Sequence, residues 1–206
     1  MSTLLQHLRT LAHANRLANL RLHGACLQLS QAEFHASRVS FFPSLWATLN
    51  HILIVDWYYV AALHGERNMR AAFRSETPFD TMTDLAAAQI TSDERLIGWC
   101  DRADDDALTA TIEMIRSDHV QRDAAERVLM HLFTHQIHHR GQAHAMLAGT
   151  HVAPPQLDEF LMPSEAHFRD DDRAALHWTE EDLFGPASAS GAAAGVATKV
   201  ATRVPR

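Results

Sequence analysis

The sequence predicts an all-α protein in which four long helices pack together as a bundle. Four segments carry apolar residues at the three- and four-residue spacing that gathers them on one face of a helix. The connections are more polar, and two of them contain Pro43 and Pro78, which interrupt helices. At 206 residues and 47% hydrophobic composition, the chain is long enough to bury such a core as a single domain.

The first helix is expected over residues 3–29. Its apolar face consists of Leu4, Leu8, Leu11, Asn15, Ala18 and Leu22. Asn15 is polar within this face, so it either reaches toward a site or bonds to a neighbouring backbone group. Residues 31–43 carry no helical stripe and end in a proline, so we expect a connection without a helix.

The second helix is expected to begin after Ser44, a favoured N-cap residue, and to end near His64, just before Gly65. It is apolar over most of its length, as an inner helix of a bundle would be. His51 and Asp56 therefore stand out, because a buried imidazole or carboxylate needs polar partners.

Residues 66–80 are polar and are expected to form a loop. A third helix is expected from Thr81 to about Ala103, because Thr81 and Asp84 have the spacing of a capping box. The three aspartates at 104–106 are expected to form a solvated turn, since they lack the alternating ligands and the glycine of a calcium-binding loop.

Residues 108–115 are rich in β-branched side chains and alternate in part, which favours a short strand or ribbon before the last long helix. The fourth helix is expected over residues 123–148, ending before Gly149. One more short helix is expected within residues 172–183.

The fourth helix carries three histidines at four-residue intervals, His131, His135 and His139, beside its apolar stripe. Residues four apart lie about 6 Å apart along the helix axis on nearly the same face, so two such imidazoles can bind one metal ion. His131/His135 and His135/His139 have identical spacing, and the spacing alone does not choose between them. With His51 on an inner helix, either pair predicts a three-histidine site inside the bundle.

The charge of the chain argues against nucleic-acid binding. The net charge is −7, and residues 185–206 contribute Lys199, Arg203 and Arg206 without an acid, so the preceding part is more acidic still. Capture of nucleic acid needs clustered basic residues facing phosphates. We expect a bundle domain over residues 1–184 and a disordered tail, rich in Ala, Gly and Ser, over residues 185–206.

Cys26 and Cys100 are expected to be small buried hydrophobic residues rather than a disulfide framework. No stretch approaches the roughly 20 apolar residues of a membrane span, and no secretory leader is recognisable. A cytoplasmic protein without membrane contact is therefore expected.

Three segments together resemble one known family. HLFTHQIHHRGQAHAML (131–147) and APPQLDEFL (153–161) are similar to the carboxy-terminal signature of the DinB family. This family is named for damage-inducible proteins and is related to the YfiT-like group of predicted metal-dependent hydrolases. TLNHILIVDWYYVAALHG (48–65) resembles the second-helix motif of the family. The similarity extends in order from about Leu4 to Leu161.

The resemblance implies an up-down four-helix bundle with a crossover connection, a divalent metal ion and a homodimer. It maps the metal ligands onto His51, His135 and His139 and makes His138 a non-ligating neighbour. Zinc or nickel is the expected metal and iron is an alternative, because three imidazoles with open positions suit all of them. The resemblance also points to a low-molecular-weight thiol as a co-substrate.

Three further residues are candidates for catalysis. Gln142, one turn beyond His139, is placed to hold a metal-bound water or substrate, or to cap a polar network. Arg140 is a candidate partner for an anionic substrate, for Asp56 or for Asp158, and the structural roles are favoured. Asp56 is the third candidate, because a carboxylate buried on an apolar helix is unfavourable unless it is paired or has a functional role.

The leading functional prediction is a metal-dependent enzyme acting on a small molecule, either a thiol-dependent S-transferase or a hydrolase, with a stress- or damage-associated role. The alternative is a non-catalytic, stress-associated metal-binding or scaffold protein. The chain lacks a nucleophile elbow, a P-loop and a dinucleotide fingerprint. For the expected homodimer, the candidate outward-facing apolar residues are Trp46, Trp57, Tyr58 and Phe73.

Overall fold

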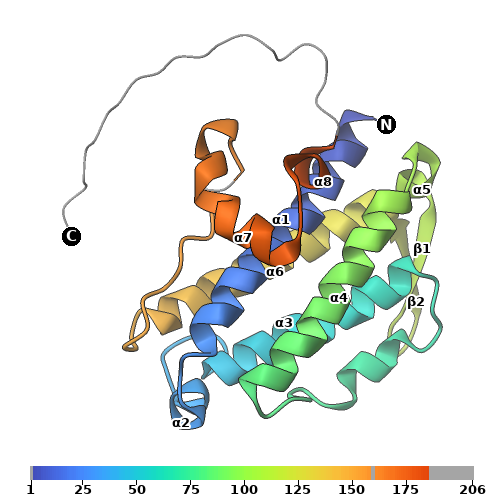
Figure 1. Cartoon of the computed structure of the whole chain (residues 1–206). Helices are drawn as coiled ribbons and strands as arrows, with labels where there is room; N and C mark the ends of the chain where they lie inside the picture. Colours follow the sequence, from blue (N-terminus) through green and yellow to red (C-terminus); the bar gives the residue numbers. More distant parts are fainter. Residues whose placement is uncertain (1, 159–160, 186–206) are drawn as a thin grey trace.

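The computed structural model describes residues 2–158 and 161–185, and it is mostly helical with one small antiparallel sheet (Figure 1). Residues 186–206, which include nearly all of the predicted tail, lie outside the described residues. In the described part, no helix has the length and apolarity needed to cross a lipid bilayer. The long helices are α1 (Thr3–Cys26), α3 (Leu45–Leu63), α4 (Met82–Arg102) and α6 (Ala125–Leu147).

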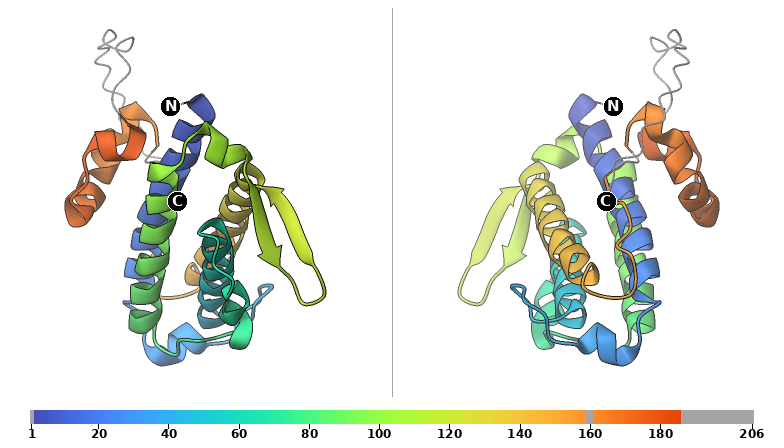
Figure 2. Two further views of the ribbon diagram at one scale, coloured as in Figure 1. Left: turned by 90° about the vertical axis from the view of Figure 1, so that its right-hand side faces the viewer. Right: turned by 90° about the vertical axis from the view of Figure 1, so that its left-hand side faces the viewer.

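The four long helices form two pairs that pack against each other. α1 lies beside α4 and α3 lies beside α6, and contacts of α3 with α4 and of α1 with α6 join the pairs (Figure 2). Apolar side chains from all four helices fill the space between them, among them Leu17, Leu53, Leu85 and Leu129. The prediction of a predominantly helical protein is confirmed, with the small sheet as an addition.

The start of two long helices is set by a side-chain cap. Ser44 Oγ accepts a hydrogen bond from the amide of Ala47 at 3.1 Å, and Thr81 Oγ1 accepts one from the amide of Asp84 at 3.1 Å. Each cap satisfies an amide that has no partner within its own helix. Gly65, with φ of 71°, follows the last turn of α3. These boundaries agree with the sequence pattern.

Three connections contain short helices, which corrects the expectation that they would be irregular. Ser30 and Glu33 form a capping box at the first of them, and Asp104 Oδ1 accepts the amide of Ala107 at 2.8 Å at the third. Side-chain capping, rather than an apolar stripe, starts the first and the third of these helices, so a search for stripes misses them. They are α2 (Gln31–His35), the 3-10 helix η1 (Met69–Arg74) and α5 (Asp105–Thr109).

The expected strand is present as β1 (Thr111–Ile115), and it pairs with β2 (Val120–Ala124) in an antiparallel hairpin. Thr111 lies opposite Ala124 at the base of the hairpin. Because β2 takes up residues 123 and 124, α6 begins at Ala125, two residues later than the sequence suggested.

Tyr58 is buried, contrary to the expectation that it faces outward. Its hydroxyl donates a hydrogen bond to the backbone carbonyl of Ile115 at 3.0 Å, which ties α3 to the hairpin. Of the other residues proposed for a partner surface, Trp46 and Trp57 are partly buried and Phe73 is exposed.

After α6 the described chain packs against α1 through α7 (Asp170–Leu176) and α8 (Glu180–Phe184), preceded by the 3-10 helix η2 (Pro163–Arg169). The sequence predicted a single helix over residues 172–183. His177 interrupts it, because its backbone is left-handed, with φ of 56°.

The two cysteines pack in the core. Cys26 and Cys100 are free and buried, and burial raises the pKa of each thiol to about 12. Both thiols therefore stay protonated at neutral pH and act as small hydrophobic groups, as the sequence predicts.

Candidate metal centre

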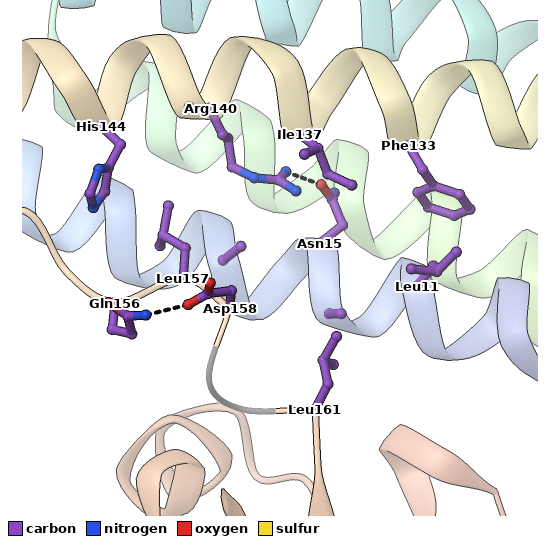
Figure 3. Close-up of a pocket in the computed structure, with 13 residues that line it drawn as sticks. Leu11, Asn15, Phe133, Ile137, Arg140, His144, Gln156, Leu157, Asp158 and Leu161 are labelled. Atoms are coloured by element: carbon purple, nitrogen blue, oxygen red, sulfur yellow. Dashed lines mark hydrogen bonds between the residues drawn. The ribbon is translucent and has the colours of Figure 1, made fainter.

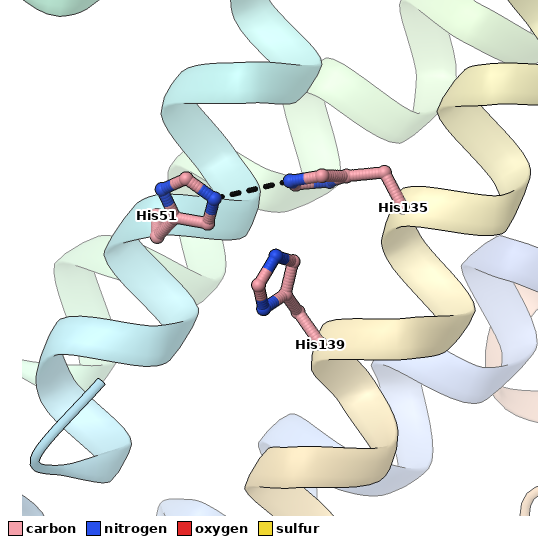
Figure 4. Close-up of side chains that lie close together, drawn as sticks. All are labelled: His51, His135 and His139. Carbon is pink, nitrogen blue, oxygen red and sulfur yellow. Dashed lines mark hydrogen bonds between the residues drawn. The ribbon is translucent and has the colours of Figure 1, made fainter. Parts of the chain in front are cut away.

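Three histidines from two neighbouring helices converge. His51 lies on α3, and His135 and His139 lie one turn apart on α6 (Figure 4). One ring nitrogen of each lies within 4.8 Å of the others, and Nε2 of His51 is 3.0 Å from Nε2 of His135. In the part of the chain that the structure describes, no other group of three His, Cys, Asp or Glu residues comes together in this way.

The local sequence explains this convergence. Buried apolar neighbours, such as Leu53 on α3 and Leu132 on α6, fix the rotation of each helix against its partner. The four-residue spacing then places His135 and His139 on one face of α6, toward α3. His51 meets them because α3 and α6 pack side by side.

The structure distinguishes the two histidine pairs that sequence spacing leaves equal. The rings of His139 and His51 have centroids 4.7 Å apart. His131 is exposed and packs instead on the ring of Tyr59, with centroids 5.1 Å apart. The cluster therefore contains His135 with His139 and leaves His131 outside.

The environment keeps the three imidazoles neutral. Burial, followed by repulsion from the neighbouring imidazoles, lowers the pKa of His51 to about 4 and that of His135 to about 3. Burial also lowers the pKa of His139. A neutral imidazole has a free lone pair, so at neutral pH the cluster can bind a metal without first losing protons. Three imidazole donors fit a divalent ion such as zinc, nickel or ferrous iron.

Gln142 contacts the cluster through His139. Its Oε1 accepts a hydrogen bond from Nδ1 of His139 at 2.9 Å, which leaves Nε2 of that ring available to a metal. Nε2 of Gln142 donates to Nε2 of His138 at 3.1 Å, and His138 itself is exposed. Outer hydrogen bonds of this kind fix the tautomer and orientation of a ligand histidine. Gln142 is therefore a positioning residue in this geometry.

Two aromatic residues, Phe41 and Phe42, form a wall beside the cluster. The sequence pattern did not predict this wall. The ring centroid of Phe42 is 4.3 Å from that of His51 and 5.5 Å from that of His139, and the Phe41 centroid is 6.4 Å from His139. Phe41 is 78% exposed. The sequence signal for this wall is two adjacent aromatic residues just before Pro43, in a connection without a helical stripe. The wall gives the cluster an apolar neighbour.

Asp56, one of the catalytic candidates, belongs to a different set of contacts. Its carboxylate accepts a hydrogen bond from Nε2 of Gln89 at 2.7 Å, and the same amide donates to Asp93 at 3.0 Å. Burial, followed by the charge of Asp93, raises the pKa of Asp56 to about 7, and burial raises that of Asp93 to about 6. Asp56 is therefore part of a buried polar network.

Arg140 extends toward α1 and joins the same network. Its Nη1 donates to Oδ1 of Asn15 and, at 3.3 Å, to Oδ1 of Asn19. Both asparagines also donate to the carboxylate of Asp93. The expected direct pairing of Arg140 with an aspartate is thus replaced by a pairing through amides. Asn15 is the buried polar residue that its place in an apolar face suggested.

The fold and the cluster place the chain in the class of predominantly helical proteins with a three-histidine cluster compatible with a divalent metal site. The model of the DinB family matches residues 1–174, and the chain belongs to the DinB family. This match confirms the resemblance drawn from the motifs. No curated protein matches the chain.

Proposed function

We propose that this protein is a divalent-metal-dependent enzyme that acts on a small molecule, either as a thiol-dependent S-transferase or as a hydrolase. The observation that supports the proposal best is the convergence of nitrogens from His51, His135 and His139 within 4.8 Å. Three protein ligands leave a coordination position open, which is typical of catalytic rather than of closed structural sites. Zinc and nickel are the proposed metals, and ferrous iron is the alternative.

A bound metal would supply Lewis-acid activation of a donor atom on the substrate or on a thiol co-substrate. The residues of the chain have separate tasks around it. The three histidines would hold the ion as neutral ligands, and Gln142 fixes the His139 ring through a hydrogen bond to its Nδ1. Phe41 and Phe42 border one side of the cluster and suit an apolar part of the substrate.

The proposal includes an up-down four-helix bundle with a crossover connection as a single domain over residues 1–184. This arrangement is supported by the helix contacts, since α1 and α3 each pack against both α4 and α6. Residues 186–206 contain few large apolar side chains, so their removal should leave the thermal midpoint nearly unchanged. A drop of several degrees on truncation after Gly185 would contradict this domain boundary.

Metal analysis of the protein purified without a nickel column tests the site. The wild-type protein should carry a stoichiometric divalent ion, and His51→Ala, His135→Ala and His139→Ala should each lose it. His131→Ala and His138→Ala are matched controls, because these histidines lie on the same helix outside the cluster, and both should retain the metal. Retention in all five variants would make the cluster a set of core polar groups and overturn the proposal.

A substrate screen separates the two reaction types. Thiols combined with electrophiles test S-transfer, and ester and amide substrates test hydrolysis. Any activity should disappear in His139→Ala and persist in His131→Ala. Tight metal binding without activity in either screen would favour the alternative, a non-catalytic, stress-associated metal-binding or scaffold protein.

We also propose that the protein is a homodimer. Exposed apolar surface is typical of proteins that associate with a partner, and a second copy of the chain is the simplest partner. Light scattering at micromolar concentration should give twice the chain mass of 23.0 kDa, and a monomer would overturn this part of the proposal. The large apolar side chains exposed in the described part include Val39, Phe41, Phe73, Met130 and Ile137.

A further inference from the structure

A second concave site, which we call the α1/α6 groove, lies between α1 and α6. It is on the α1 side of α6 (Figure 3), whereas the three histidines lie between α3 and α6 (Figure 4). Residues 156–158 and Leu161, from the segment after α6, form its outer edge. Its volume of about 430 Å³ is in the range of small-molecule sites. Its apolar lining includes Leu11, Ala14, Phe133, Ile137, Leu157 and Leu161.

Arg140 places a positive charge at the inner wall of this apolar groove. The residue is only 7% exposed, and its Nη1 donates hydrogen bonds to the side-chain oxygens of Asn15 and Asn19. Nε and Nη2 have no hydrogen-bond partner among the described residues, and neither atom is fully buried. Arg140 lines the groove, so these two groups are the ones available to a ligand there. A guanidinium edge with two parallel N–H donors matches the two oxygens of a carboxylate.

The surrounding charges limit the kind of anion that fits. The guanidinium of Arg140 is a cation at neutral pH. Asp93 and Asp56 lie within electrostatic reach on its core side. Asp158, at the rim of the groove, accepts a hydrogen bond from Gln156. The Asp158 carboxylate at the rim repels a dianion such as a phosphate monoester more strongly than a single negative charge, so a monoanion fits better.

We propose that the α1/α6 groove binds an amphipathic monocarboxylate, that is, an aryl or alkyl carboxylic acid. The carboxylate accepts hydrogen bonds from Nε and Nη2 of Arg140, and the apolar body lies along Phe133 and Ile137. Ile137 is 59% exposed in the groove, so a ligand that covers it removes apolar surface from water. This site is separate from the histidine cluster and does not depend on the proposed enzymatic activity.

Calorimetric titration with phenylbutyrate and its neutral amide, phenylbutyramide, tests the charge requirement. The two probes have nearly the same shape, so the difference in affinity reports on the carboxylate. The acid should bind about tenfold or more tightly than the amide, because hydrogen bonds between charged groups are stronger than those to a neutral amide. Arg140→Gln should remove this difference. Equal affinity of both probes for the wild-type protein, or no binding of either, would overturn the proposal.

A second pair of variants tests the groove without touching the buried network, since replacing Arg140 removes one of the cations that act on Asp93. A Cβ added at Gly141, which lines the groove, meets nothing within 4 Å. Gly141→Phe should fill the groove and abolish binding, whereas Gly141→Ala should bind as the wild type does. His51→Ala should also retain binding. Loss in His51→Ala, or unchanged binding in Gly141→Phe, would place the probe elsewhere and overturn the assignment.

Discussion

Gln142 and His139 lie one turn apart on α6, and Nδ1 of the His139 ring donates a hydrogen bond to Oε1 of Gln142 at 2.9 Å. This contact selects the tautomer in which Nε2 is free to face the other two histidines. Gln142→Leu removes the acceptor and should weaken zinc binding by about 10- to 100-fold. A titration in competition with a chelator measures the change.

Gln142→Glu is the matched control, because it keeps an acceptor at the same position. It should bind zinc at least as tightly as the wild-type protein does. Wild-type affinity in Gln142→Leu would mean that the glutamine does not orient His139. Circular dichroism should show the same helix content in both variants.

The long helices and the histidine cluster could be anticipated because both depend on short-range spacing. Apolar residues at helical intervals and the caps at Ser44 and Thr81 locate the helices. Four-residue spacing puts His135 and His139 on one face. The choice of His139 over His131 needed the family resemblance, because only the packing of α3 on α6 decides which histidine meets His51.

The remaining parts of the site depend on contacts that spacing does not specify. Arg140 follows His139 directly, but one residue turns a helical side chain by about 100°, so it points toward α1. Asp56 lies five residues after His51, a rotation of about 140° from it, and faces α4. The Phe41–Phe42 pair reaches the cluster only through the path of an irregular connection, which no periodic pattern predicts.

The buried carboxylate of Asp56 should make stability fall as the pH rises. Its pKa is raised from 3.8 to about 7 in the folded protein, so between these values the folded state holds a proton that the unfolded state has released. Unfolding free energy then decreases as pH rises from about 4 to about 7. Asp56→Asn removes this contribution, so the variant should gain stability relative to the wild type across that range.

Urea denaturation of both proteins at pH 5 and pH 7.5 measures the effect. Buried histidines act in the opposite direction, since burial lowers the pKa of His23 to about 3 and stability is lost as the pH falls from about 6.5. They are present in both proteins and cancel in the comparison. A stability difference that is the same at the two pH values would contradict the raised pKa of Asp56.

The cap at Ser44 should contribute measurably to stability because it starts the helix that carries His51. Its Oγ accepts the amide of Ala47, and the residue is buried, so water cannot replace the hydroxyl fully. Ser44→Ala should lower the unfolding free energy by about 1 kcal/mol. Ser44→Thr keeps the hydroxyl and should lose less, and equal losses in both variants would assign the effect to packing.

Metal binding should stabilise the folded protein, because the proposed ligands come from α3 and α6 and only the folded chain brings them together. At a zinc concentration of about 100 times Kd, the expected gain in unfolding free energy is about 2.7 kcal/mol. Thermal denaturation should therefore shift to higher temperature with zinc and return with a chelator. His131→Ala should show the full shift and His139→Ala a much smaller one. Equal shifts in these two variants would mean that zinc binds at other histidines, which would contradict the three-histidine site.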